Sequence, residues 1–209
     1  MQITEVAGYD KRRRKVVLDG GEVVFLLYEG ECRRFGIRAG DTLSEEVYQR
    51  ILAEILLPRA KKRLLYALKT GDKTKQQLTQ KLRAGFYPPQ VITAALSFLE
   101  NLHLLDDSRY AENFVSRKKE SCSRKELTAK LMQKGIGRSE IARQLADVSS
   151  EDEYAACKSA LEKRCSAKRG GAAALEDADE RRRIYGYLAR RGYSFDLIER
   201  VVRAFRKET

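Results

Sequence analysis

Several residue types are scarce in this chain, and their scarcity argues against several kinds of site. The 209 residues include one histidine, His103, four cysteines and no tryptophan. Cys32, Cys122, Cys157 and Cys165 form no Cys-x-x-Cys pair, whereas zinc sites need closely spaced cysteine and histidine ligands. We therefore expect no metal, no other cofactor and no catalytic residue.

Long apolar runs are also missing. No stretch approaches the roughly 20 apolar residues that cross a bilayer. The N-terminal MQITEVAGYDKRRRK has no apolar segment after its charges, which is unlike a signal peptide. Cys157 and Cys165 share an apolar stripe with Tyr154 and Leu161, which predicts core residues with reduced thiols. Reduced thiols are typical of the cytosol, so we expect a cytoplasmic protein with no membrane partner.

Positive charge, by contrast, is abundant. Lys and Arg number 42 against 30 Asp and Glu, which gives a net charge of +12 and a pI near 9.6. Hydrophobic residues make up 43% of the chain, enough to bury a core. Such an excess of positive charge favours polyanionic partners, which are nucleic acid, acidic protein surfaces or anionic membranes.

The first 57 residues predict a small module of a β-hairpin and a helix. KVVLDGGEVVFLLY has two β-rich runs around a turn at Asp19-Gly20-Gly21, and the earlier run ITEV is a candidate third strand. A helix is then predicted from a capping box in which Glu45 follows Thr42 by three residues. Pro58 is predicted to end it.

The remainder is predicted to be helical and repetitive, with domains at residues 58–105, 106–149 and 150–209. Apolar residues recur in steps of four, ten and four: Leu78, Leu82, Ile92 and Leu96; Leu127, Leu131, Ile141 and Leu145; Ile184, Leu188, Ile198 and Val202. A further helix precedes each set, at 59–69, 109–120 and 151–167. The unit is therefore three helices in about fifty residues, and stacked units would form an elongated, curved body.

Caps and stops accompany the apolar pattern. Two copies begin with capping boxes, Thr74 with Gln77 and Ser123 with Glu126, while the third has Asp179 and Glu180. A glycine that we expect to be left-handed ends the middle helix of each copy: Gly85, Gly135 and Gly192. The last helices are predicted to start at Pro89, after Gly137 and after Ser194. The third copy also carries an insertion near residues 168–180, read as a loop.

The acidic doublet Asp106-Asp107 lies where the second copy begins. Aspartate there can accept hydrogen bonds from the first helical N–H groups, and Tyr110, Ala111 and Phe114 then share one face of the helix. A catalytic pair would need a histidine, a nucleophile or more carboxylates nearby, and the sequence offers no such set. We interpret the doublet as a helix cap.

The polar faces of the three copies are strongly basic. Nine Lys or Arg accompany Asp72 alone between Arg59 and Arg83, three Glu between Arg117 and Arg143, and two acids between Arg181 and Lys207. An ordinary solvated face would mix the signs. The positive stripe favours contact with phosphates or an acidic groove. The candidate contact residues are Lys61, Lys62, Arg63, Arg117, Lys118, Arg124, Lys125, Lys130, Lys134, Arg190 and Arg191.

Two further readings concern nucleic acid. Tyr66, Tyr87, Tyr193 and Phe195 could stack on bases, although such residues more often pack in cores. Each three-helix copy could also act as a helix-turn-helix module, but such modules concentrate their contacts on one recognition helix, and here the positive residues spread over all three.

A nuclease would need clustered carboxylates for metal, and the acidic residues are scattered.

Several segments carry a family resemblance. LHLLDDSRYAENFVSRKK, followed by SRKELTAKLMQKGI, resembles the signature of the RecX family, the regulators of the RecA recombinase. YLARRGYSFDLIERVV resembles its C-terminal counterpart, and KVVLDGGEVVFLL resembles the hairpin region of longer members. Asp106, Asp107, Tyr110, Ala111, Phe114, Gly135 and Gly192 belong to the matching pattern. The chain departs from it at KLRAGF, one residue short before Gly85, and at the third-repeat insertion.

The resemblance implies a non-enzymatic, monomeric protein of tandem three-helix units. It implies binding to the RecA–DNA filament, with inhibition of ATP hydrolysis, filament growth and strand exchange, in DNA repair, homologous recombination and the SOS response. Direct contact with single- or double-stranded DNA is a further expectation. A direct DNA-binding protein built from helix-turn-helix-like units remains the alternative.

Overall fold

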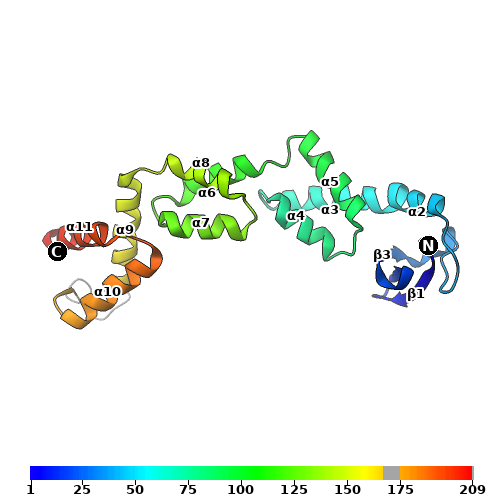
Figure 1. Ribbon diagram of the computed structural model, residues 1–209, viewed down its shortest axis with the longest axis horizontal. Helices are drawn as coiled ribbons and strands as arrows, with labels where there is room; N and C mark the ends of the chain where they lie inside the picture. The colour runs from blue at the N-terminus through cyan, green and yellow to red at the C-terminus, as the bar shows by residue number, and fades with distance from the viewer. Residues whose placement is uncertain (167–174, 209) are drawn as a thin grey trace. The chain divides into compact units, whose positions relative to one another are not determined.

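A computed structural model describes residues 1–166 and 175–208, and the chain is mainly α-helical with one small sheet (Figure 1). It divides into two compact units, Met1–Asp106 and Asp107–Thr209, here called the N-terminal and C-terminal units. The N-terminal unit includes both the predicted hairpin module and the predicted first repeat. Within the described residues, no helix has the length and apolar character needed to cross a membrane.

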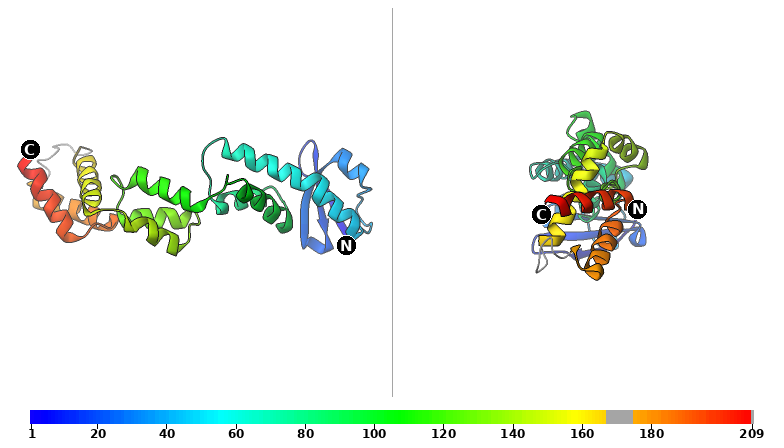
Figure 2. Two further views of the ribbon diagram at one scale, coloured as in Figure 1. Left: turned by 90° about the horizontal axis from the view of Figure 1, so that it is seen from above. Right: turned by 90° about the vertical axis from the view of Figure 1, so that its left-hand side faces the viewer.

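The N-terminal sheet is antiparallel, with strands β1 (Ile3–Gly8), β2 (Arg13–Leu18) and β3 (Val23–Tyr28) in that order (Figure 2). The candidate third strand is therefore confirmed as β1. Asp19, Gly20 and Gly21 make the turn between β2 and β3, with φ values of 47°, 70° and 116°. Gly-Gly suits this turn because glycine adopts positive φ at little cost.

The helices after the sheet correct two predictions. α1 spans Glu29–Arg34 and α2 spans Glu45–Ile51. The cap of α2 is Ser44, whose hydroxyl accepts from Val47 N at 3.2 Å, so the predicted Thr42 cap is wrong. Pro58 does not end the helix either: a π-helical turn at Leu52–Leu56 leads directly into α3, Leu57–Leu68. Pro58 lies in the first turn of α3, where a missing N–H costs little.

The first three-helix domain consists of α3, α4 (Lys75–Arg83) and α5 (Pro89–Asn101). Thr74 and Gln77 form the predicted capping box, and α5 begins at Pro89 as predicted. The predicted left-handed Gly85 is wrong, since Phe86 takes that conformation instead, with φ 56°. The Phe86 ring packs against Tyr9 of the β1–β2 turn, with ring centroids 5.6 Å apart.

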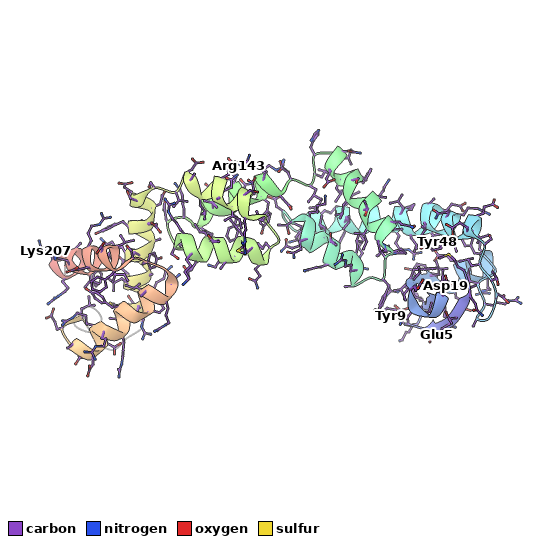
Figure 3. All side chains as sticks on the ribbon, viewed as in Figure 1. Glu5, Tyr9, Asp19, Tyr48, Arg143 and Lys207 are labelled. Atoms are coloured by element: carbon purple, nitrogen blue, oxygen red, sulfur yellow. The ribbon has the colours of Figure 1, made fainter. Side chains whose placement is uncertain are left out.

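The second three-helix domain consists of α6 (Asp107–Lys118), α7 (Arg124–Gln133) and α8 (Arg138–Ala146). Gly135 has φ 85° and Gly137 precedes α8, both as predicted. Arg143 of α8, labelled in Figure 3, donates to Ser108 Oγ at 2.6 Å, and this bond connects α8 to the start of α6. Arg143 also pairs with Glu140 of its own helix at 2.7 Å.

The third domain consists of α9 (Ser150–Ser166), α10 (Ala178–Arg191) and α11 (Phe195–Glu208). Gly192 has φ 101° and ends α10 as predicted. The cap of α10 is Asp177, which accepts from Glu180 N at 2.7 Å, so the cap lies upstream of the predicted Asp179 and Glu180. The insertion read as a loop lies partly outside the described residues, and its last residues, from Ala178, are helical.

Candidate functional site

The most elaborate polar contact in the C-terminal unit joins α7 to the end of α10. Arg191 donates to both Glu126 oxygens, each at 2.9 Å, and to the Tyr187 hydroxyl at 3.1 Å. The Ser123 hydroxyl donates to the backbone carbonyl of Arg191. Ser123 and Glu126 also form the capping box of α7, so the same two side chains cap one helix and bind the next domain. We call Ser123, Lys125, Glu126, Arg191 and Gly192 the seam.

Glycine is essential to the closeness of the seam. A Cβ atom placed on Gly192 would lie 2.5 Å from Lys125 Cβ and 2.8 Å from Lys125 Cδ. Any larger residue would push the Lys125 stem, and with it α7, away from α10. The glycine therefore serves two ends, the left-handed stop at φ 101° and the packing of one domain on the other.

Further ion pairs connect the second domain to α9. Lys119 reaches Asp152 at 3.1 Å, and Arg124 lies 3.6 Å from Glu153. Arg124 also donates to the Leu145 carbonyl at 3.2 Å and to the Val148 carbonyl. Arg124 was predicted as an exposed contact residue. Its hydrogen bonds show that it stabilises the fold at the end of α8.

The charges of the seam stabilise one another. Burial raises the pKa of the Glu126 carboxyl, but the hydrogen bonds and charge of Arg191 outweigh it, leaving the pKa below its ordinary value of 4.5. The same hydrogen bonds raise the pKa of Arg191 against the opposing effect of its burial. The pair is therefore charged at neutral pH, with both side chains about one-fifth exposed, at 21% and 22%.

Two buried groups lie close behind the seam. The ammonium group of Lys130, a predicted contact residue, donates a hydrogen bond to the buried Sγ of Cys122 at 3.0 Å. The Tyr193 hydroxyl is buried and makes no hydrogen bond within the described part of the chain. Burial also raises the pKa of Tyr193, which keeps it neutral.

Other predicted contact residues are engaged within their own unit. Lys61 lies over the Phe98 ring at 4.2 Å, and Lys134 lies 6.0 Å from the Tyr110 and Phe114 rings. Arg63 lies beside Gly85, and Arg117 donates to the Asn113 carbonyl at 3.0 Å. The exposed members of the predicted set whose side chains make no ion pair, hydrogen bond or ring contact within residues 1–166 and 175–208 are Lys62, Lys118, Lys125 and Arg190.

Three of these exposed cations lie in or next to the seam, since the Lys118 carbonyl accepts from the N–H of Cys122, the residue before Ser123, at 2.9 Å. Lys118 ends α6, Lys125 follows the cap of α7, and Arg190 directly precedes Arg191. The seam therefore connects the domains through its partly buried ion pair and leaves further positive charges in solvent. Such an arrangement can hold a polyanion without catalysing a reaction on it.

The aromatic candidates separate by burial. Tyr87 and Tyr193 are core residues, 8% and 4% exposed, whereas Tyr66 and Phe195 are 69% and 66% exposed. Among the signature residues, Asp107 is the first residue of α6, directly after Asp106, and Ala111 is fully buried. The Tyr110 and Phe114 rings are stacked, 6.3 Å apart.

The pairing of Glu126 with Arg191 was missed from the sequence. The two residues lie 65 positions apart, and the capping box alone accounted for Glu126. No periodic pattern links a carboxylate in one copy to an arginine in the next. Among the residues that the structure describes, no group of three or more His, Cys, Asp or Glu could hold a metal ion.

Comparisons with known proteins agree on one family. Residues 106–145 match the family model described as RecX, second three-helix domain, and residues 151–202 match RecX, third three-helix domain. Regulatory protein RecX of Thermobifida fusca is 32% identical over 152 residues, covering 72% of this chain and 80% of that protein. The chain belongs to the RecX family. Regulatory protein RecX of Clostridium botulinum strain Eklund 17B is 26% identical over 201 residues, covering 95% and 92%.

Solved structures of the family share the fold. A crystal structure of regulatory protein RecX has a TM-score of 0.61 at 23% identity, covering 96% of this chain and 98% of that one. RecX from Lactobacillus salivarius has a TM-score of 0.59 at 20% identity, covering 71% and 95%. The family thus supplies both the three-helix domains and the designation of its members as regulatory proteins.

Proposed function

We propose that this chain is a non-enzymatic regulator of the RecA recombinase. It binds the RecA–DNA filament and mostly inhibits ATP hydrolysis, filament growth and strand exchange, as a cytoplasmic monomer in homologous recombination, DNA repair and the SOS response. The observation that carries the proposal is membership of a family whose curated relatives are named regulatory protein RecX.

The surface of the C-terminal unit supports this proposal. A RecA–DNA filament is a polyanion, and Lys118, Lys125 and Arg190 offer unneutralised positive charge beside the seam. The partly buried pair of Glu126 and Arg191 connects the two domains that carry these charges. Positive charges held at fixed spacing bind an extended polyanion with a smaller loss of conformational entropy than the same charges on a flexible chain would.

The ATPase rate of the cognate recombinase on single-stranded DNA tests the proposal. Adding the purified chain in amounts below one per recombinase should lower the rate and shorten the filaments, because a regulator that stops growth acts at few positions. An unchanged rate, with circular dichroism showing a folded helical protein, would contradict the proposal.

A direct DNA-binding protein is the second candidate, and the net charge of +12 is the observation that favours it. The two candidates differ in what they need. A filament regulator binds recombinase-coated DNA more tightly than the same DNA bare, whereas a DNA-binding protein loses its site when recombinase covers the strand. Equilibrium binding to both forms at equal salt distinguishes them.

A further inference from the structure

The first three-helix domain contains a cleft that the proposed function leaves unexplained. It lies between α3 and α4 and has a volume of about 420 Å³. It is lined by Tyr66, Leu78, Lys73, Lys81, Gln77 and Gln80, among others. The side-chain oxygen of Gln77 accepts from Thr74 N at 3.1 Å in the capping box of α4. No carboxylate lines it, so its charge is wholly positive.

Tyr66 is the unusual member of this lining. It is 69% exposed, the highest value among the exposed large hydrophobic side chains of the described chain. Other rings of the N-terminal unit carry a cation: Arg59 lies 4.7 Å from Tyr28 and Arg13 lies 5.1 Å from Tyr9. The Tyr66 ring has no ring or cation partner within residues 1–166 and 175–208. An aromatic ring held in solvent beside a cleft has a face available for a ligand.

Lysines surround this ring on the same side of the domain. Lys62 and Lys69 lie one turn before and one turn after Tyr66, at the spacing that shares a helix face. Lys73 and Lys81 approach from the loop before α4 and from α4 itself. These four have no ion pair within the described residues, whereas Arg59 pairs with Glu31 and Lys61 covers Phe98. Arg59 is therefore neutralised within the fold, whereas these four lysines keep an unpaired positive charge that an anion can contact.

We propose that this cleft binds a segment of single-stranded nucleic acid. Tyr66 stacks on one unpaired base, Lys73 and Lys81 contact the flanking phosphates, and the Gln80 amide reaches the base edge. An exposed ring among lysines is the combination that single-strand binding sites use. An acidic peptide would use the lysines but not the ring. A duplex would use the lysines too, but its bases already stack on one another.

This site goes beyond the proposed regulation of the recombinase, and it gives the second candidate, direct DNA binding, a specific strand and specific residues. It lies wholly in the N-terminal unit, on residues that the seam does not include. Its tests therefore use the full chain with oligonucleotide alone, and their outcome is independent of any effect on recombinase ATPase.

The absence of tryptophan from the chain makes stacking directly observable. Tyr66→Trp places a single indole at the cleft, and Phe195→Trp places one at an equally exposed position in the other unit as the matched control. Adding a 15-residue oligothymidylate should quench the fluorescence of the first variant strongly and that of the second weakly. Equal quenching of both, or no quenching of either, would overturn the proposal.

Affinity measurements separate the ring from the charges. By fluorescence anisotropy with labelled oligothymidylate, Tyr66→Ala should weaken binding about tenfold and Tyr66→Phe should restore it, since one stacked base contributes that much. Lys73→Gln with Lys81→Gln should lower the log–log salt slope by about 1.4, at about 0.7 for each lost contact. Lys11→Gln with Arg12→Gln removes the same charge from the β1–β2 turn and should lower it less.

Two competitors complete the test. Polyglutamate of matched charge and a blunt duplex should each displace the oligothymidylate less well than unlabelled oligothymidylate does. If polyglutamate competes equally and Tyr66→Ala binds like the parent, the cleft is a site for acidic protein and the proposal fails. If the duplex competes equally, stacking on an unpaired base is excluded and the proposal also fails.

Discussion

In the N-terminal unit the sheet and the first three-helix domain share one apolar core, whereas the C-terminal unit has two apolar cores with a polar seam between its domains. The first core runs from Ile3 of β1 through Ile51 and Leu64 to Leu99 of α5. In the C-terminal unit, Leu127 and Leu188 belong to different cores. Polar contacts connect these domains: Arg191 binds Glu126 and Ser123, Lys119 pairs with Asp152, and Arg124 lies 3.6 Å from Glu153.

The difference concerns what each joint responds to. Apolar burial is non-directional and involves no charges that salt could screen, so the sheet should stay on the first domain as pH and ionic strength change. A joint made of an ion pair, a capping hydroxyl and a glycine depends on geometry and on charge state. The C-terminal unit should therefore be the part of the chain in which single substitutions separate the domains.

The largest expected effect comes from Gly192→Ala. The new Cβ meets Lys125 at 2.5 Å in a residue at φ 101°, so steric clash and backbone strain together should cost about 3 kcal/mol. Gly71→Ala in the N-terminal unit is the matched control, since φ is 115° there with nothing within 4 Å. It should cost only the strain, about 1–2 kcal/mol. Amide hydrogen exchange in each unit measures both, and equal costs would show that the seam contact is unimportant.

Removing the charge partner should have the next largest effect. Arg191→Met leaves Glu126 in the seam without its two hydrogen bonds of 2.9 Å and should cost about 2 kcal/mol in the C-terminal unit. Adding Glu126→Gln should recover part of that cost, because the unpaired carboxylate is then gone. A double-mutant cycle from urea unfolding gives the coupling energy, and a value near zero would mean that the pair does not join the domains.

Acid should loosen the seam by a smaller amount. The folded-state pKa of Glu126 is lowered, so its contribution is fully present above its ordinary pKa of 4.5 and is lost as pH falls through the lower, folded-state pKa. Urea unfolding of the parent and of Glu126→Gln between pH 7 and pH 3 isolates this contribution. The difference in free energy of unfolding should be constant above about pH 5 and shrink below it. A difference that grew on acidification would contradict the lowered pKa.

The smallest effect concerns Phe86, which stands where the other two domains have Gly135 and Gly192. At φ 56° glycine should be more favourable than alanine by about 1 kcal/mol, because it carries no Cβ. Phe86→Gly should therefore be more stable than Phe86→Ala by that amount in urea unfolding. Equal stabilities would mean that the left-handed conformation at Phe86 is not retained once its packing on Tyr9 is removed.

The sequence predicted what local chemistry determines. The helices of the three repeats were predicted correctly, and all residues of the four-ten-four apolar pattern are buried. The capping boxes at Thr74 and Ser123 and the left-handed Gly135 and Gly192 were also correct, because each depends on neighbours within one turn. Pro58 was misread because a π-helical turn before it, which no local signal announces, keeps the helix continuous.

The candidate site was less predictable because it depends on distant partners. A count of Lys and Arg treats Arg124 and Lys125 alike, yet one is bound to two carbonyls and the other is exposed. Arg191 binds Glu126 while the adjacent Arg190 is exposed to solvent, and this difference follows from the packing of α10 on α7. The lysines around Tyr66 were visible in the sequence, but the exposure of its ring was not.

The most direct test of the account is whether the exposed cations near the seam carry the effect on the recombinase. We would compare the parent, the triple variant Lys118→Gln, Lys125→Gln and Arg190→Gln, and a control triple, Lys163→Gln, Arg182→Gln and Lys207→Gln, of equal charge loss. The readout is inhibition of the recombinase ATPase on single-stranded DNA. The account predicts that half-inhibition by the first triple needs about tenfold more protein or beyond, while the control stays close to the parent. Equal inhibition by all three proteins, at equal helicity, would contradict it.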